Sequence, residues 1–256
     1  MRFRMPFRLK AFGLHLLASA TALTLVLGSL YLDWYRWPGW YLSSVLHVVG
    51  IVVMVDLVLG PTLTLIVANP GKPRRELVRD ISMIVTVQLA ALVYGTVTLW
   101  GGRPLYYTFS VNSLELVQAS DIDAAERALA RRQNPSLAPH WYSLPRWIWA
   151  PLPKDPQEAL AIVQSTVLGG GKDVVSMPRY FRPWDHGLPE LRKQLTRVDD
   201  MTYLNRAEKK SIKALMSREG LAPDERNTLI MWGNSRRLLA VFDPATLHMK
   251  ALLIPG

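Results

Sequence analysis

The chain has 256 residues, half of them hydrophobic, and it carries a formal net charge of +10 but no cysteine. The absence of cysteine excludes disulfide bonds and thiolate chemistry, so any domain outside a membrane must fold on its own hydrophobic core. The basic residues of the second half are scattered and form no stripe interleaved with aromatic residues, which argues against a nucleic-acid partner.

The sequence also lacks the usual marks of a catalytic or metal site. The histidines beyond residue 103, which are His140, His186 and His248, do not have the spacing of metal ligands. No nucleophile elbow and no phosphate-binding loop is present. We therefore expect a binding protein rather than an enzyme, with no cofactor, no metal and no small-molecule substrate.

Three charge-poor segments fill the first hundred residues, over 11–32, 41–69 and 81–101. About 20 apolar residues suffice for a helix to cross a bilayer, so each segment predicts a membrane-spanning helix. A cleaved signal peptide is the alternative for the first segment, but its apolar run is about twice the length that is usual for one. The sequence predicts a transmembrane domain over 1–102, followed by a domain of ordinary globular composition over 103–256.

Basic residues near these segments set the expected orientation, because short loops rich in Lys and Arg stay on the cytoplasmic side of a membrane. They precede the first segment and fill the loop between the second and third segments: Arg2, Arg4, Arg8, Lys10, Lys72, Arg74, Arg75 and Arg79. Between the first and second segments Arg36 stands alone among several Trp and Tyr residues. We expect a cytoplasmic N-terminus and a C-terminal domain on the opposite side.

The second segment contains one formal charge, Asp56, which falls near the middle of the membrane. A carboxyl group there is costly, and such residues usually serve a function. Gly60 and Pro61 follow, and because proline has no N–H to donate, the carbonyl of Leu57 should lose its helical partner. Gln88 of the third segment lies at a similar depth. The pair indicates either a hydrogen bond that joins two helices or a groove in which another membrane helix docks.

The C-terminal domain should be α+β with an antiparallel sheet. Alternation over 105–111 and 114–117 predicts a hairpin that turns at Asn112-Ser113, with Tyr107 and Phe109 on one face. The six prolines of residues 135–156 predict a loop. We further expect helices over 121–132, 156–168, 188–195 and 206–218, the last capped by Asn205, and strands over 227–232, 238–242 and 247–254.

Three segments together resemble a known family. Gly39-Trp40-Tyr41 precedes the run VDLVLGPTLTLIV, which begins at Val55; the third segment contains QLAALVYG, which begins at Gln88; and Arg103-Pro104-Leu105-Tyr106 leads into the hairpin. Over about residues 39–120 this pattern resembles the type IV pilin accessory proteins (TfpX/TfpZ-like). It departs from them at the expected hairpin turn, where Asn112-Ser113 replaces an Asp-Arg-like pair.

The resemblance implies a multi-pass protein of the bacterial inner membrane with a periplasmic C-terminal domain. Its function would be that of a chaperone, which binds and stabilises a type IV pilin and aids its assembly into pili, without catalysis. The partners would be the pilin's transmembrane helix and globular head, beside the lipid bilayer. The expected partner-binding residues are Asp56, Gly60, Pro61, Gln88 and Tyr94 in the membrane and Arg103, Tyr107 and Phe109 in the hairpin.

We expect the hairpin to meet the pilin head, for which β-augmentation is one mode. The alternative function is a membrane-anchored sensor or transport subunit whose external domain binds a small ligand. Asp56 would then belong to an ion path, for which three helices are few unless the protein oligomerises.

Overall fold

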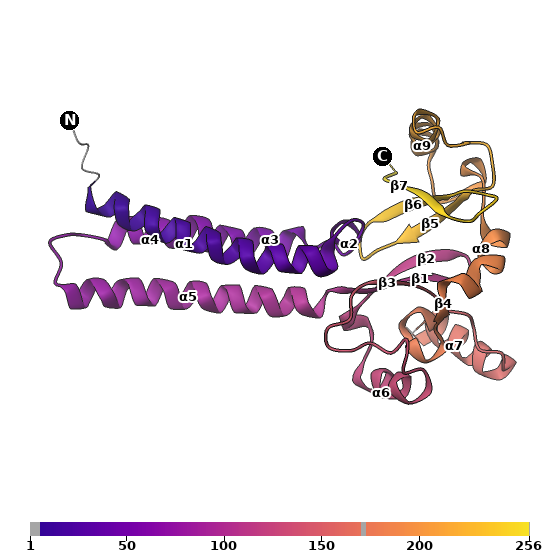
Figure 1. Ribbon diagram of the computed structural model, residues 1–256, viewed down its shortest axis with the longest axis horizontal. Helices are drawn as coiled ribbons and strands as arrows, with labels where there is room; N and C mark the ends of the chain where they lie inside the picture. Colours follow the sequence, from indigo (N-terminus) through magenta and orange to yellow (C-terminus); the bar gives the residue numbers. More distant parts are fainter. Residues whose placement is uncertain (1–5, 170–172, 256) are drawn as a thin grey trace. The chain divides into compact units, whose positions relative to one another are not determined.

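The computed structural model describes residues 6–169 and 173–255. The chain divides into two units (Figure 1): a helical unit of residues 1–36 and 45–102, and a sheet unit of residues 37–44 and 103–256. Arg2 and Arg4, which contribute to the expected orientation, lie outside the described residues.

The described part of the helical unit holds three helices that are long and apolar enough to cross a membrane, Phe7–Tyr35, Leu46–Val67 and Arg74–Gly101. The first consists of α1 (Phe7–Leu30) and a π-helical end, η1 (Tyr31–Tyr35), and the third is the single helix α5 (Arg74–Gly101). Both begin earlier than the apolar segments predicted, because Arg, Lys and Glu are good helix formers and carry the helix past the apolar run.

The second helix is built from α3 (Leu46–Val53), a π-helical stretch η2 (Met54–Leu59) and α4 (Gly60–Val67). It begins later than the predicted segment 41–69, because the chain before it folds with the sheet unit. There the short helix α2 (Gly39–Leu42) ends before Ser44, which has a left-handed φ of 55°.

Residues 37–44 are fixed in the sheet unit by backbone and side-chain contacts. The N–H of Asn234 donates to the carbonyl of Leu42 at 2.9 Å, and the Leu42 side chain is fully buried. The Arg236 guanidinium lies over the Tyr41 ring. In a chain with three membrane-spanning helices, the segments after the first and after the third lie on the same side. Their membership of one folded unit fits that arrangement.

The described residues of the sheet unit form one sheet in the order β4-β3-β1-β2-β5-β6-β7. The strands are β1 (Pro104–Ser110), β2 (Ser113–Gln118), β3 (Arg146–Trp149), β4 (Arg182–Pro183), β5 (Thr228–Trp232), β6 (Arg237–Phe242) and β7 (Met249–Leu253). β3 is parallel to β1 and β5 is parallel to β2, whereas the other pairs are antiparallel. The predicted antiparallel sheet is therefore wrong, and the sheet is mixed.

Two local details of this domain also differ from expectation. β3 lies inside the proline-rich stretch that was expected to be a loop. The hairpin turns at Val111-Asn112, one residue early, because Ser110 pairs with Ser113 and Val111 takes a left-handed φ of 46°. The pairing register also shifts between Pro104 and Tyr106.

The predicted helices of this domain are present as α6 (Ala124–Gln133), α7 (Pro156–Gly169), α8 (Leu188–Gln194) and α9 (Arg206–Arg218). Short 3-10 helices connect them at η3 (Ala119–Asp121), η4 (Val174–Ser176), η5 (Pro178–Tyr180), η6 (Trp184–Gly187) and η7 (Val198–Asp200). Asn205 caps α9 as expected, with its side chain accepting from the N–H of Glu208 while the Glu208 carboxylate accepts from the N–H of Asn205.

Both faces of the sheet are covered by apolar side chains. One face carries Tyr107 and Phe109 and packs against Leu191 of α8. On the other face, Tyr106 packs in a cluster that includes Ile162 of α7 and Phe181, whereas Leu239 and Val241 pack against α9. Figure 1 shows α6 and α7 on the side of the sheet unit where β3 and β4 lie, and α9 beside β6 and β7.

Candidate functional site

The π-helical stretch around Asp56 moves the effect of Pro61 by one residue. In η2 the hydrogen bonds span five residues, since the N–H of Gly60 donates to the carbonyl of Val55. The next bond in this register would run from residue 61 to the carbonyl of Asp56, and Pro61 has no N–H to make it. The acceptor that loses its partner is therefore the Asp56 carbonyl and not that of Leu57, as the α-helical register had predicted.

Gln88 of α5 supplies the missing donor. Its Nε2 donates to the Asp56 carbonyl at 3.1 Å, and the Gln88 side chain is 7% exposed. The amide lies directly over Gly60, so that a Cβ at this position would overlap it. Gly60 and Pro61 thus have one joint consequence: the proline frees a carbonyl, and the glycine makes room for the side chain that binds it.

The bond from Gln88 to the Asp56 carbonyl also determines the hydrogen bonds of His15 and Thr64. Because Gln88 turns its amide nitrogen to Asp56, its Oε1 faces His15 Nε2 at 2.7 Å, so the imidazole must carry a proton on Nε2. In the neutral imidazole Nδ1 then accepts from the Thr64 hydroxyl, 2.5 Å away. Gln88 Nε2 also reaches the Ser19 hydroxyl at 3.5 Å. The network links α1, α4 and α5.

One oxygen of the Asp56 carboxyl group, Oδ2, remains outside this network. Asp56 is 4% exposed, and its Oδ2 has no hydrogen-bond partner among the residues that the structure describes. It lines a cavity of about 200 Å³ between α1 and α5, which we call the Asp56 pocket: His15, Ala18, Ser19, Ala22, Asp56, Val85, Gln88, Leu89 and Leu92. Because Ala18, Ala22, Val85 and Leu89 are exposed, the pocket opens to the outside of the helical unit.

A second cavity, of about 240 Å³, lies on the other side of Gln88, and we call it the Gly60 pocket. It is lined by Val55, Leu59, Gly60, Leu63, Met83, Ile84, Val87 and Gln88. Tyr94 lines neither pocket. It follows Val87 by two helical turns on the same face of α5, and its side chain is 76% exposed. The structure thus brings Asp56, Gly60, Pro61 and Gln88 together and leaves Tyr94 apart.

The expected site residues of the hairpin belong to the core of the sheet unit. Arg103, Tyr107 and Phe109 are all buried, and an Arg103 amino group donates to the carbonyl of Trp141 at 2.9 Å. Burial also raises the pKa of the Tyr107 phenol above its ordinary value. β1 pairs with β2 and β3, and β2 pairs with β1 and β5, so neither strand offers an edge to another chain. The expected β-augmentation at this hairpin is therefore wrong.

Sequence reasoning missed His15 and Thr64. His15 was not singled out among the residues of the first segment. Yet it lies eight residues beyond Phe7, the start of α1, which is a depth of about 12 Å at the rise of an α-helix.

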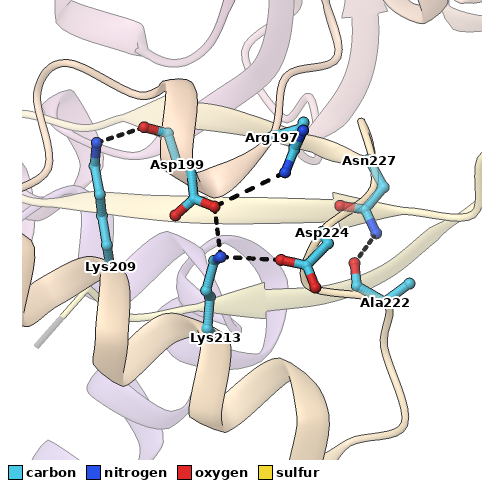
Figure 2. Close-up of polar contacts among 7 residues, drawn as sticks. All are labelled: Arg197, Asp199, Lys209, Lys213, Ala222, Asp224 and Asn227. Atoms are coloured by element: carbon cyan, nitrogen blue, oxygen red, sulfur yellow. Dashed lines mark hydrogen bonds and ion pairs between the residues drawn. The ribbon is translucent and has the colours of Figure 1, made fainter.

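The sheet unit has a further polar cluster beside α9, which Figure 2 shows. The Lys213 ammonium lies between the carboxylates of Asp199 and Asp224, at 2.5 and 2.9 Å. The hydrogen bond from Lys213 holds the pKa of Asp199 below its ordinary value. Lys209 donates to the Asp199 carbonyl at 2.7 Å. These contacts attach α9 to η7, and the exposed Arg206 beside them lines an open hollow of about 490 Å³.

Comparison with known proteins gives three relatives, all from Dichelobacter nodosus. The fimbrial assembly protein of serogroup I is 26% identical over 226 residues, which are 87% of this chain and 85% of that protein. That of serogroup E1 is 25% identical with the same coverage. That of serogroups C1 and C2 is 31% identical over 119 residues, which are 46% of this chain and 91% of that protein.

No family model matches the chain, and no solved structure matches it. The relatives nevertheless agree in name, two of them match most of the chain, and the third is matched over nearly its whole length. On this evidence the chain belongs to the family of fimbrial assembly proteins.

Proposed function

We propose that the protein takes part in the assembly of type IV fimbriae by holding the fimbrial subunit, the pilin, in the membrane before it is incorporated. The helical unit would bind the pilin's apolar helix within the inner membrane, and the sheet unit would meet the globular head in the periplasm. The role is that of a chaperone and involves no catalysis. The narrower assignment to the TfpX/TfpZ-like accessory proteins is part of this proposal.

The observation that carries the proposal is the Asp56 pocket. A carboxyl oxygen without a partner lies at its base, and its rim is exposed on the outside of the helical unit. Ala18 and Ala22 on this rim are one turn apart on α1. Small residues at this spacing let a second helix approach closely. The pocket thus combines a shape and a polar group that a partner helix can use and that lipid chains cannot.

The physics of membranes explains why both features are needed. Lipid chains are as apolar as leucine, so the hydrophobic effect does not hold two helices together in a bilayer. Close packing and interhelical hydrogen bonds remain as the attractive terms. A binding site for a membrane helix should therefore show small residues beside an unsatisfied polar group, as the Asp56 pocket does.

We place the contact with the pilin head away from the hairpin strands, each of which is paired on both sides. β7 (Met249–Leu253) lies at one end of the sheet order and pairs with β6 on one side. The other end, β4 (Arg182–Pro183), has two residues, so β7 is the longer edge if the head adds a strand to this sheet.

The experiment that tests the proposal fills the pocket without touching the network. Replacing Ala22 by Trp should block the rim, because Ala22 lines the pocket and is exposed. The matched control is Leu17→Trp, on the far side of α1 and 65% exposed. Both variants are solubilised from cells that make the pilin, and the pilin that co-purifies is measured.

We expect capture of the pilin to fall about tenfold for Ala22→Trp, which corresponds to about 1.4 kcal/mol, and to be unchanged for Leu17→Trp. Equal capture by both variants would contradict the proposal.

The proposed orientation has its own test, which the absence of native cysteine makes simple. A single cysteine in place of Lys210, an exposed residue of α9, should react with a membrane-impermeant thiol reagent that is confined to the periplasm. A cysteine in place of Arg75, in the first turn of α5 and on the side expected to be cytoplasmic, should react only after the inner membrane is opened. The reverse pattern would place the sheet unit in the cytosol, out of reach of a periplasmic pilin head.

A further inference from the structure

We propose that the Asp56 pocket binds one hydrogen-bond-donating side chain, carried into it by the membrane helix that docks there. This inference deepens the proposed function and rests on it for one point only, that the occupant is a helix. It adds the chemical property that distinguishes an accepted helix from any other apolar helix.

The amide, imidazole and Thr64 donors of the polar network are already committed, and the Ser19 hydroxyl, which accepts from Gln88, does not reach Asp56 Oδ2. Gln88 Nε2 points its two hydrogens at the Asp56 carbonyl and the Ser19 hydroxyl. The His15 Nε2 proton goes to Gln88 Oε1, and the Thr64 hydroxyl proton goes to His15 Nδ1. Among the residues that the structure describes, none of these donors reaches Asp56 Oδ2, which is buried without a partner.

Burying Asp56 Oδ2 without a hydrogen-bond partner costs free energy. A buried polar atom that loses its hydrogen bond costs about 1–3 kcal/mol, and more when it is charged. Gln88 cannot donate to Asp56 Oδ2 without giving up its present bond. Turning its amide towards the carboxyl would leave the Asp56 carbonyl without the donor that Pro61 cannot provide. The missing donor must therefore come from outside the helical unit.

The volume of the Asp56 pocket limits what can enter it. The Asp56 pocket has a volume of about 200 Å³. An apolar cavity of about 150 Å³ holds one benzene molecule, so the pocket has room for one side chain and not for a whole helix. The docking helix would lie along the rim and project one residue inward.

The position of the pocket along the helices limits where a hydrogen-bond donor can come from. The exposed rim residues Ala18, Val85 and Leu89 lie in the middle of two membrane-spanning helices. At that depth the lipid consists of hydrocarbon and carries no donor. A donor reaches this level on the side chain of another membrane helix.

The test uses three synthetic apolar helices of about 20 residues, which are identical except at one central position. The position holds glutamine, which donates and accepts; methionine sulfoxide, which only accepts; or norleucine, which does neither. Each labelled helix is reconstituted with the full-length protein in lipid nanodiscs, and binding is measured by energy transfer.

We expect the glutamine helix to bind about tenfold more tightly than the norleucine helix, the effect of an interhelical hydrogen bond of about 1–2 kcal/mol. The methionine sulfoxide helix should bind no more tightly than the norleucine helix. Replacing Asp56 by Leu should abolish the preference for glutamine, and so should Ala22→Trp, which fills the pocket and leaves the network in place.

The matched control is Asp80→Leu, which removes another acid of the helical unit. The Asp80 carboxylate pairs with the Lys72 ammonium at 2.8 Å, and neither residue lines the Asp56 pocket. This variant should keep the preference. Equal binding of the glutamine and norleucine helices to the unaltered protein would overturn the inference, and so would a preference that survives Asp56→Leu.

These outcomes differ from failure of the proposed function. If the pilin is not captured but the glutamine helix is still preferred, the proposed function fails and the donor-binding pocket stands. If the pilin is captured through the Ala22 rim but no donor preference is found, this inference alone fails.

Discussion

The two units of this chain differ in how they treat large apolar side chains. In the sheet unit the buried side chains are mainly apolar and pack in three clusters against both faces of the sheet. In the helical unit large apolar side chains such as Leu14, Leu25 and Ile51 are exposed, whereas Asp56, Thr64 and Gln88 are buried. Removing apolar surface from water stabilises the first unit. That driving force is absent between helices in lipid, where hydrogen bonds and close packing replace it.

One glycine in each unit allows a close approach, but of a different kind. In the helical unit a Cβ at Gly95 would overlap the Val52 side chain, so this glycine lets α3 and α5 approach. In the sheet unit a Cβ at Gly233 would overlap the carbonyl of Leu42. The first glycine brings two helices together, and the second allows a distant segment of backbone to join the sheet.

The largest effect should come from removing a core side chain of the sheet unit. Phe181 is fully buried and stacks edge to face on Tyr106 at 5.0 Å. Phe181→Ala should lower the free energy of unfolding of this unit by about 3–5 kcal/mol. Leu25→Ala in the helical unit removes an exposed side chain and should change stability by less than about 0.5 kcal/mol. Denaturant unfolding of the full-length protein in detergent measures both, and similar costs would erase the contrast between the units.

The next effect should come from the bond between Gln88 and the Asp56 carbonyl. Gln88→Leu leaves that carbonyl without a donor and should cost about 1–2 kcal/mol. Pro61→Ala restores an N–H to the backbone at the position that lacks one. In a double-mutant cycle the two changes should therefore be non-additive, with Gln88→Leu costing about 1 kcal/mol less in the Pro61→Ala background. Simple additivity would show that Gln88 does not substitute for the proline's missing donor.

A smaller effect is expected at the start of α9. The Asn205 side chain accepts from the N–H of Glu208 at 2.9 Å. Asn205→Ala should cost about 1 kcal/mol of unfolding free energy, as the loss of such a cap usually does. Asn205→Ser, which keeps a capping oxygen, is the control. If alanine and serine give the same midpoint, the cap contributes nothing here.

The smallest effect should appear in the pH dependence of the cluster beside α9. Lys213 lowers the pKa of Asp199 below its ordinary 3.8. A carboxylate with a lowered pKa stabilises the fold above its ordinary pKa, and this contribution is lost as the pH falls below that value and through the lowered pKa. Between about pH 5 and about pH 3 the sheet unit should lose slightly more stability in the unaltered protein than in Lys213→Met. A larger loss in the variant would reverse the sign of this interaction.

How far the sequence predicts each unit follows from the forces that shape it. Asp56, Gly60, Pro61 and Gln88 were identifiable because a carboxyl, a proline and an amide are conspicuous in apolar segments. The π-helical register could not be read from the same residues, and it decides which carbonyl Gln88 binds. His15 was not predicted, because its partners come from two other helices.

In the sheet unit, local signals worked where the partner is near in sequence. Asn205 and Glu208 predict the start of α9, and the alternation over 105–117 predicts the hairpin. The predicted strand directions were wrong because β3 and β5 pair with strands far along the chain. Periodicity within a strand carries no information about its neighbours. Tyr107 and Phe109 were expected to bind a partner, whereas apolar side chains such as Leu191 cover their face of the sheet and bury them.

The most direct test of the central claim is photocrosslinking in cells that assemble fimbriae, from two neighbouring positions of α5. Leu89 lines the Asp56 pocket and Val87 lines the Gly60 pocket, and the two side chains are similarly exposed at 55% and 61%. If the Asp56 pocket receives the helix of the pilin, a photoreactive residue in place of Leu89 should capture the pilin and one in place of Val87 should not. Capture from Val87 alone, or from neither position, would contradict the account.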